Sequence, residues 1–170
     1  MFEVTEKEAT GEVAEIYQDI RETMDMPFVN TIWRNFATKE GVLQWVWYSL
    51  KPIYDSGAVA HYASELRSSL DVSSVSPIPV SAFNILGISN QDRQHISEFL
   101  DNVNFGNSQN IIGLSTIYSD PSDERINKTF KKFEKRQYSD LPPLMDLDML
   151  GKDEKDLFDV INLIGQEVSV

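Results

Sequence analysis

Four asparagines gather around a single glycine in the second half of the chain: Asn102, Asn104, Asn107 and Asn110 surround Gly106. Asparagine and glycine are both unfavourable inside helices, although the flanking segments have helical apolar spacing. One interpretation is a helix-ending turn, with Asn or Gly in the left-handed conformation. The other is a break between two helices that presents an amide, which could bind a small anion or position a water molecule.

Other residue types with useful chemistry are sparse. The two histidines, His61 and His95, fall on separate predicted helices, and neither has acids at metal-binding spacing on a shared face. The chain contains no cysteine, which excludes disulfides, thiolate nucleophiles and cysteine-based zinc sites. The eight glycines are scattered and form no phosphate-binding loop. We therefore expect no metal site, and a core or surface role for each histidine.

The aromatic run Trp45-Val46-Trp47-Tyr48 is the other conspicuous group. Packing in a core or an interface is the simpler interpretation. A buried tryptophan N–H nevertheless needs a hydrogen-bond partner, so a polar cavity lined by one of these rings is the alternative.

Periodicity in the first half of the chain predicts four helices. The first begins after Thr10 and ends before Pro27, and its apolar side chains are Val13, Ile16, Tyr17, Ile20 and Met24. The others cover about 28–37, 42–53 and 57–70. The helix at 42–53 is apolar nearly all round and should be buried on more than one side, with Pro52 ending or kinking it. The fourth should direct inward Val59, Tyr62, Ala63, Leu66 and Leu70.

After a serine- and proline-rich connection at 71–79, a short helix is predicted at 80–86. Ser89 and Asp92 resemble a capping box that starts a helix to about Val103. The asparagine cluster then interrupts the helical pattern, and a further helix follows that ends near Tyr118. No convincing β pattern occurs, so the predicted fold class is all-α.

A change of composition near Tyr118 divides the chain into two predicted parts. Residues 1–118 form a helical core, and residues 119–170 form a C-terminal arm rich in charge and proline. The arm has helical patterns near 126–135 and 153–164. We expect it to pack on the core or on a partner subunit.

The composition also limits the compartment and the partners. The formal net charge of −12 argues against a nucleic-acid partner. No apolar stretch reaches the length of a membrane span, and the N-terminus has no secretory signal pattern. We expect a cytoplasmic protein without nucleic-acid or membrane binding.

Three stretches, in this order and spacing, resemble one repeat of the group I D,L-2-haloacid dehalogenases. They are residues 16–21 (IYQDIR), Pro27-Phe28-Val29 with 43–47 behind it, and Asn104-Phe105-Gly106-Asn107, which is the most specific. The resemblance covers roughly residues 10–118. It implies an all-helical fold similar to the alkylhydroperoxidase D superfamily, without that superfamily's cysteine pair. It also implies that no cofactor is needed.

The resemblance further implies roles for individual residues. Dehalogenases of this family have two similar repeats in one chain, and an aspartate activates water for direct attack on the α-carbon of a 2-haloacid. Asn107 aligns with an asparagine of the first repeat that helps to hold this water, whereas Ile32 stands where the aspartate of the second repeat is expected. A hydrolytic attack needs a base within hydrogen-bond reach of the water, and isoleucine cannot serve.

These observations lead to one main hypothesis and two alternatives. We expect a homodimer that binds a small organic acid in a cavity between helices or subunits, lined by Asn30, Thr31, Trp33, Trp45, Asn104 and Asn107. An active hydrolase could instead use another carboxylate, such as Asp19 or Glu40. The third possibility is a non-catalytic helical dimer whose centre is filled by side chains.

Overall fold

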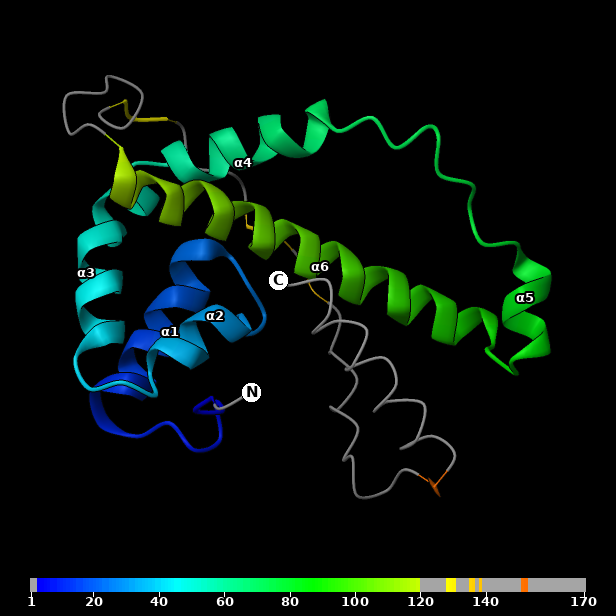
Figure 1. Cartoon of the computed structure of the whole chain (residues 1–170), viewed down its shortest axis with the longest axis horizontal. Helices are drawn as coiled ribbons and strands as arrows, with labels where there is room; N and C mark the ends of the chain where they lie inside the picture. The colour runs from blue at the N-terminus through cyan, green and yellow to red at the C-terminus, as the bar shows by residue number, and fades with distance from the viewer. Residues whose placement is uncertain (1–2, 120–127, 131–134, 137, 139–150, 153–170) are drawn as a thin grey trace.

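A computed structural model describes residues 3–119, 128–130, 135–136, 138 and 151–152. Every regular element among these residues is helical, which confirms the all-α prediction (Figure 1). The elements are α1 (Gly11–Met24), α2 (Thr31–Phe36), α3 (Val42–Asp55), α4 (Ala58–Ser69), α5 (Val80–Ile85), α6 (Asn90–Ser115) and the 3₁₀ helix η1 (Thr116–Tyr118). None of these helices combines the length and the apolar character of a bilayer span.

The core lies between α1, α2, α3, α4 and the C-terminal half of α6 (Figure 1). Helix α1 buries the predicted stripe of Ile16, Tyr17, Ile20 and Met24. It ends two residues before Pro27, because Asp25 takes the left-handed conformation with φ 54°. The backbone N–H of Asp25 donates to the carbonyl of Arg21, which closes the last turn of the helix.

Helix α3 is buried on one side only, so the prediction of burial on more than one side is wrong. Leu43, Val46, Trp47 and Leu50 face the core. Trp45 and Tyr48, three residues apart on the opposite face, are 63% and 54% exposed. The helix also continues two residues beyond the predicted end, since Pro52 is followed by helical residues up to Asp55. On α4, Val59 and Ala63 are buried as predicted, whereas Leu70 is exposed.

Helix α6 runs without a break for 26 residues, so the predicted interruption at 104–107 is wrong. Its start is as predicted: the hydroxyl of Ser89 accepts from the N–H of Asp92, and the Asp92 carboxylate accepts from the N–H of Ser89. Gly106 therefore lies inside the helix. Close packing of the chain at this position, and not a helix end, explains why the residue is a glycine.

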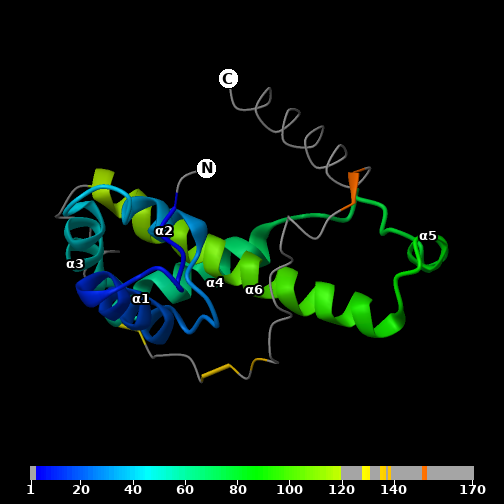
Figure 2. The same ribbon diagram turned by 90° about the horizontal axis from the view of Figure 1, so that it is seen from below.

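Helix α5 and the N-terminal half of α6 extend away from the other helices in both views (Figures 1 and 2). A long exposed connection, residues 70–79, leads to them from α4. Their surface carries exposed apolar side chains, namely Val80, Ile85, Leu86, Ile96, Phe99 and Leu100.

Little of the predicted arm belongs to the described residues. The helix predicted at 153–164 lies outside them, and residues 128–130 and 135 of the one predicted at 126–135 are not helical. Phe130 packs against α4, with its ring stacked on His61 at a centroid distance of 4.2 Å. Its N–H donates to the carbonyl of Ser56 at 2.8 Å.

Candidate functional site

An amide pair joins the turn before α2 to the middle of α6. Asn30 precedes the first residue of α2, and its Nδ2 donates to Oδ1 of Asn107 at 3.1 Å. Asn30 is 7% exposed, and its own Oδ1 is a buried acceptor without a partner. The approach depends on Gly106, because a Cβ there would lie 2.8 Å from Oδ1 of Asn30. An unpaired buried acceptor of this kind could accept a hydrogen bond from a bound molecule or from water.

A cavity of about 420 Å³ opens beside this pair. One part of its wall is apolar and consists of Phe28, Val29, Ile32, Phe99 and Val103. The polar part consists of Glu6, Asn30, Thr31, Arg34 and Asn107. A small molecule with an apolar body and one polar end would match this division.

The two charged residues of this cavity already have partners. Glu6 accepts from the backbone N–H of Val29 at 2.8 Å, and its second oxygen is paired with Arg21. Arg34 forms an ion pair with Glu3 at 3.3 Å and donates to the hydroxyl of Thr31 at 3.1 Å. The Nε of Arg34 is buried and has no partner. A carboxylate group could therefore bind to this guanidinium without displacing an existing contact.

Trp33 lies in the core, behind the cavity wall. Its ring is fully buried and packs edge-to-face on Trp47 at 5.4 Å between centroids. Its Nε1 donates to Oδ1 of Asn110 on α6 at 2.9 Å. One asparagine of the predicted cluster thus satisfies a buried tryptophan, and Trp33 does not reach the cavity surface.

Two further residues predicted for the site point to solvent. Trp45 is on the outer face of α3, and Asn104 is exposed on α6. Asn107 is also exposed on α6, but it lines the cavity, whereas Asn104 does not. Of the predicted lining residues, the structure therefore brings together Asn30, Thr31 and Asn107, with Ile32 beside them.

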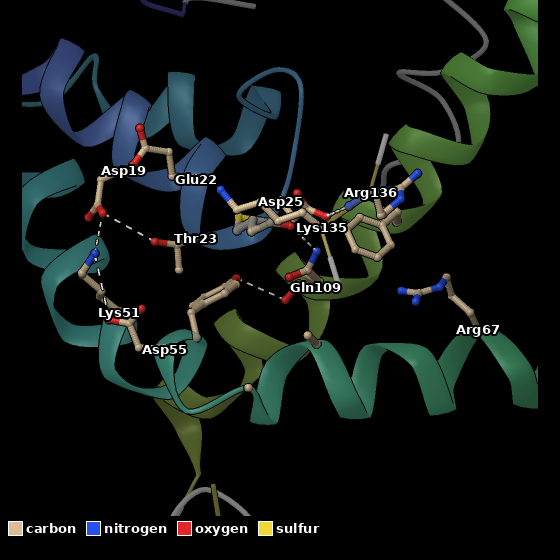
Figure 3. A pocket seen from close by; sticks show the side chains of 15 residues that line it. Asp19, Glu22, Thr23, Asp25, Lys51, Asp55, Arg67, Gln109, Lys135 and Arg136 are labelled. Atoms are coloured by element: carbon tan, nitrogen blue, oxygen red, sulfur yellow. Dashed lines mark hydrogen bonds and ion pairs between the residues drawn. The ribbon is translucent and has the colours of Figure 1, made fainter. Parts of the chain in front are cut away.

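The carboxylates proposed as substitute bases also lie elsewhere. Glu40 is exposed in the turn before α3. Asp19 lines a different, larger cavity, where it is paired with Lys51 and accepts from Nε1 of Trp47 at 2.7 Å (Figure 3). Partial burial raises the pKa of Asp19, but the hydrogen bonds from Lys51 and Trp47 outweigh it and hold the pKa below its usual value.

Sequence reasoning missed Glu6 and Arg34 at this site. Glu6 belongs to the N-terminal segment, which reaches Arg34 of α2 where the N–H of Val4 donates to the carbonyl of Arg34 at 3.1 Å. No local pattern signals a pairing between segments 30 residues apart in the chain. Within the described residues, no group of three or more acidic, histidine or cysteine side chains is placed to hold a metal ion.

The fold and the amide pair thus define an all-helical protein with one small, half-polar cavity beside α6. Comparison with known proteins finds partial similarity to 2-haloacid dehalogenases. Over 55 residues the chain is 34% identical to an (R)-2-haloacid dehalogenase of Pseudomonas putida, which covers 32% of this chain and 18% of that protein. Over 114 residues it is 25% identical to a configuration-inverting 2-haloacid dehalogenase of Pseudomonas sp. (strain 113), covering 66% of this chain and 37% of that protein.

The chain therefore spans well under half the length of these relatives. The resemblance to 2-haloacid dehalogenases inferred from the residues is confirmed as a partial one. No family model matches the chain, and no solved structure matches it.

Proposed function

We propose that this dehalogenase-like protein binds a small organic acid in the cavity beside Asn30 and Asn107, and that it does not hydrolyse 2-haloacids. The observation that supports this is the lining of one cavity by Asn30, Asn107 and Ile32. The amide that would hold a water molecule and the isoleucine that replaces the expected aspartate line this same cavity. The site would therefore bind an organic acid but would lack the base that hydrolysis requires.

The ligand would bind through its carboxylate to the polar part of the wall. The guanidinium of Arg34 and Nδ2 of Asn107 are the donors on the cavity wall that would bind an anion. A short apolar substituent would then contact Phe28 and Val103. A cavity of about 420 Å³ accommodates an acid of a few carbon atoms together with water.

An active hydrolase is the alternative, and Glu6 is the observation that favours it. Among the described residues that line the cavity, Glu6 is the only carboxylate. Both of its oxygens already accept hydrogen bonds, which leaves it poorly placed to take a proton from water. Binding without turnover is therefore the stronger proposal.

Halide release from D- and L-2-chloropropionate separates these proposals. The wild type, Asn107→Ala and Glu6→Gln would be assayed together, with binding of 2-chloropropionate measured by calorimetry. We expect binding by the wild type, weaker binding by Asn107→Ala, and no halide release by any of them. Release that disappears in Glu6→Gln would establish the hydrolase instead. Absence of saturable binding would leave a structural protein.

We also propose that the described helices correspond to one repeat of the dehalogenase body, with the expected alkylhydroperoxidase D-like arrangement, and that a second copy covers α5 and the start of α6. Ile85 and Leu86 are 84% and 73% exposed, and Leu100 and Phe99 continue the apolar surface on α6. A surface of this kind is a frequent site of association. Light scattering of the wild type and of Leu100→Lys tests it: a dimer and a monomer are expected, respectively, and a monomeric wild type rules it out.

A further inference from the structure

The larger cavity lies on the neighbouring face of α6 and has a volume of about 740 Å³ (Figure 3). No residue lines both cavities. Helix α6 separates them, since Phe105 and Gln109 face the larger one and Val103 and Asn107 face the smaller one. The two cavities can therefore be studied independently by substitution.

Two arginines converge on one aromatic ring in the larger cavity. The guanidinium carbon of Arg67, on α4, is 4.9 Å from the ring centroid of Phe105, and that of Arg136 is 4.0 Å from it. Both rest against the ring, so their planes are held in position by cation–π contact. Figure 3 shows them at the end of the cavity opposite Asp19, Lys51 and Asp55.

Neutral groups hold both arginine side chains. Nη1 of Arg67 donates to the hydroxyl of Ser108 at 2.5 Å, and Nη2 of Arg136 donates to Oδ1 of Asn102 at 2.8 Å. Ser108 and Asn102 are buried residues of α6. The guanidinium groups are thus fixed in direction, but their charges are not neutralised by these contacts.

Among the described residues, no carboxylate forms an ion pair with either guanidinium. Asp25 is close, but its carboxylate accepts the backbone N–H of Arg136 at 2.8 Å. Nη1 of Arg136 is buried and has no hydrogen-bond partner. Burial, and then the charge of Arg136, lower the pKa of Arg67, as expected for a partly buried cation beside a second cation.

We propose that Arg67 and Arg136 form a binding site for an oxyanion, a carboxylate or phosphate group on a small molecule. Arg67 and Arg136 line the same cavity, and a guanidinium offers paired N–H donors that match the geometry of such a group. The exposed Lys135 lines the same cavity and adds a third positive charge near its opening. This site goes beyond the proposed function, because it shares no residue with the cavity beside Asn107.

The anion would also connect two distant parts of the chain. Arg67 belongs to α4, whereas Arg136 lies near the end of the described residues, where Tyr138 also donates to the carbonyl of Asp25. A ligand that neutralises both cations would strengthen the attachment of residues 135–138 to the core. Occupancy should therefore raise the thermal stability of the protein as well as being measurable directly.

The test is calorimetric titration of the full chain with inorganic phosphate and, separately, with malonate, in a buffer free of both. We expect saturable binding of at least one, and the stronger of the two identifies the group. Arg67→Gln and Arg136→Gln should each weaken it by about tenfold or more, from the loss of one charge-assisted contact. Arg67→Lys, which keeps the charge but not the fork, should retain part of the affinity.

Arg93→Gln is the matched control, because Arg93, on α6, likewise rests on an aromatic ring, that of Phe83, but lies outside the cavity. It should bind phosphate like the wild type, and so should Asn107→Ala, whose side chain does not line this cavity. Thermal unfolding without ligand identifies any variant that fails to fold. If Arg67→Gln fails to fold, the anion affinity of Arg67→Lys is compared with that of the wild type instead. The proposal is overturned if neither anion gives saturable binding, if Arg93→Gln loses as much affinity as Arg67→Gln, or if the loss occurs in Asn107→Ala instead.

Discussion

Gly106 is in direct contact with Asn30: a Cβ at position 106 would lie 2.8 Å from Oδ1 of Asn30 and 2.7 Å from Cε of Met26. The missing side chain lets α6 approach the turn before α2 closely enough for Asn30 and Asn107 to form their hydrogen bond. Gly113, two turns later on the same face, lies similarly against the ring of Tyr54. The glycines of α6 therefore serve contact between helices.

Gly106→Ala should destabilise the protein although alanine favours helices. We expect a loss of about 1–3 kcal/mol in the free energy of unfolding, because Met26 and Asn30 must move to make room. Urea unfolding measures it. Asn104→Ala is the control on the exposed face of the same helix, and should stay within about 0.5 kcal/mol of the wild type. A Gly106→Ala protein as stable as Asn104→Ala would show that the contact is loose.

Trp33→Phe should destabilise the core by more than its lost apolar area. It removes the N–H that donates to Oδ1 of Asn110, whose Nδ2 already has no partner. Leaving a buried amide unsatisfied costs about 1–3 kcal/mol. Adding Asn110→Leu to Trp33→Phe should recover part of this loss in chemical unfolding, and a purely additive double variant would contradict the coupling.

Ile32→Asp should introduce halide release from 2-chloropropionate if the loss of the aspartate alone ended the reaction. The new carboxylate would share the cavity of Asn107 and would be able to deprotonate a water held there. Ile32→Asn, equal in shape but not basic, is the control and should release nothing. Activity in both variants, or in neither while 2-chloropropionate still binds, would mean that residue 32 is not the deciding position.

Asp19→Asn should make stability less dependent on pH in acid. The pKa of Asp19 in the folded protein is lower than the ordinary value for an aspartate, so the ionised form stabilises the fold. This contribution is complete above the unfolded-state pKa, declines below it, and is lost as pH falls through the lowered value. The stability difference between wild type and Asp19→Asn should therefore shrink in that acidic range. Glu15→Gln, exposed on the same helix, should show no such change.

The helical elements could be predicted from sequence where local chemistry decides them. The apolar spacing of α1 and the capping box at Ser89 and Asp92 act within a few residues, so their signals are complete in the sequence. The family resemblance also singled out Asn107 and Ile32, each by its alignment. Both residues line the same cavity.

The errors arose where tertiary contact outweighs local preference. Gly106 and its asparagines indicated a helix break, yet packing against Met26 favours a continuous helix. Trp45 is apolar but exposed, and no pattern in the sequence tells a core face from an uncovered one. Arg67 and Arg136 meet only because α4 and residues 135–138 converge on Phe105, which is a contact between segments 69 positions apart.

The unbroken α6 has a consequence for amide hydrogen exchange. Its C-terminal half is held by the core, where Gln109 and Asn110 are buried, whereas the stretch around Ile96 and Leu100 is largely exposed. One continuous helix should therefore exchange at two rates: slowly, through global unfolding, near Gly113, and quickly, through local opening, before residue 101. If a second copy covers the outer half, its protection will rise with protein concentration while that of the inner half stays constant.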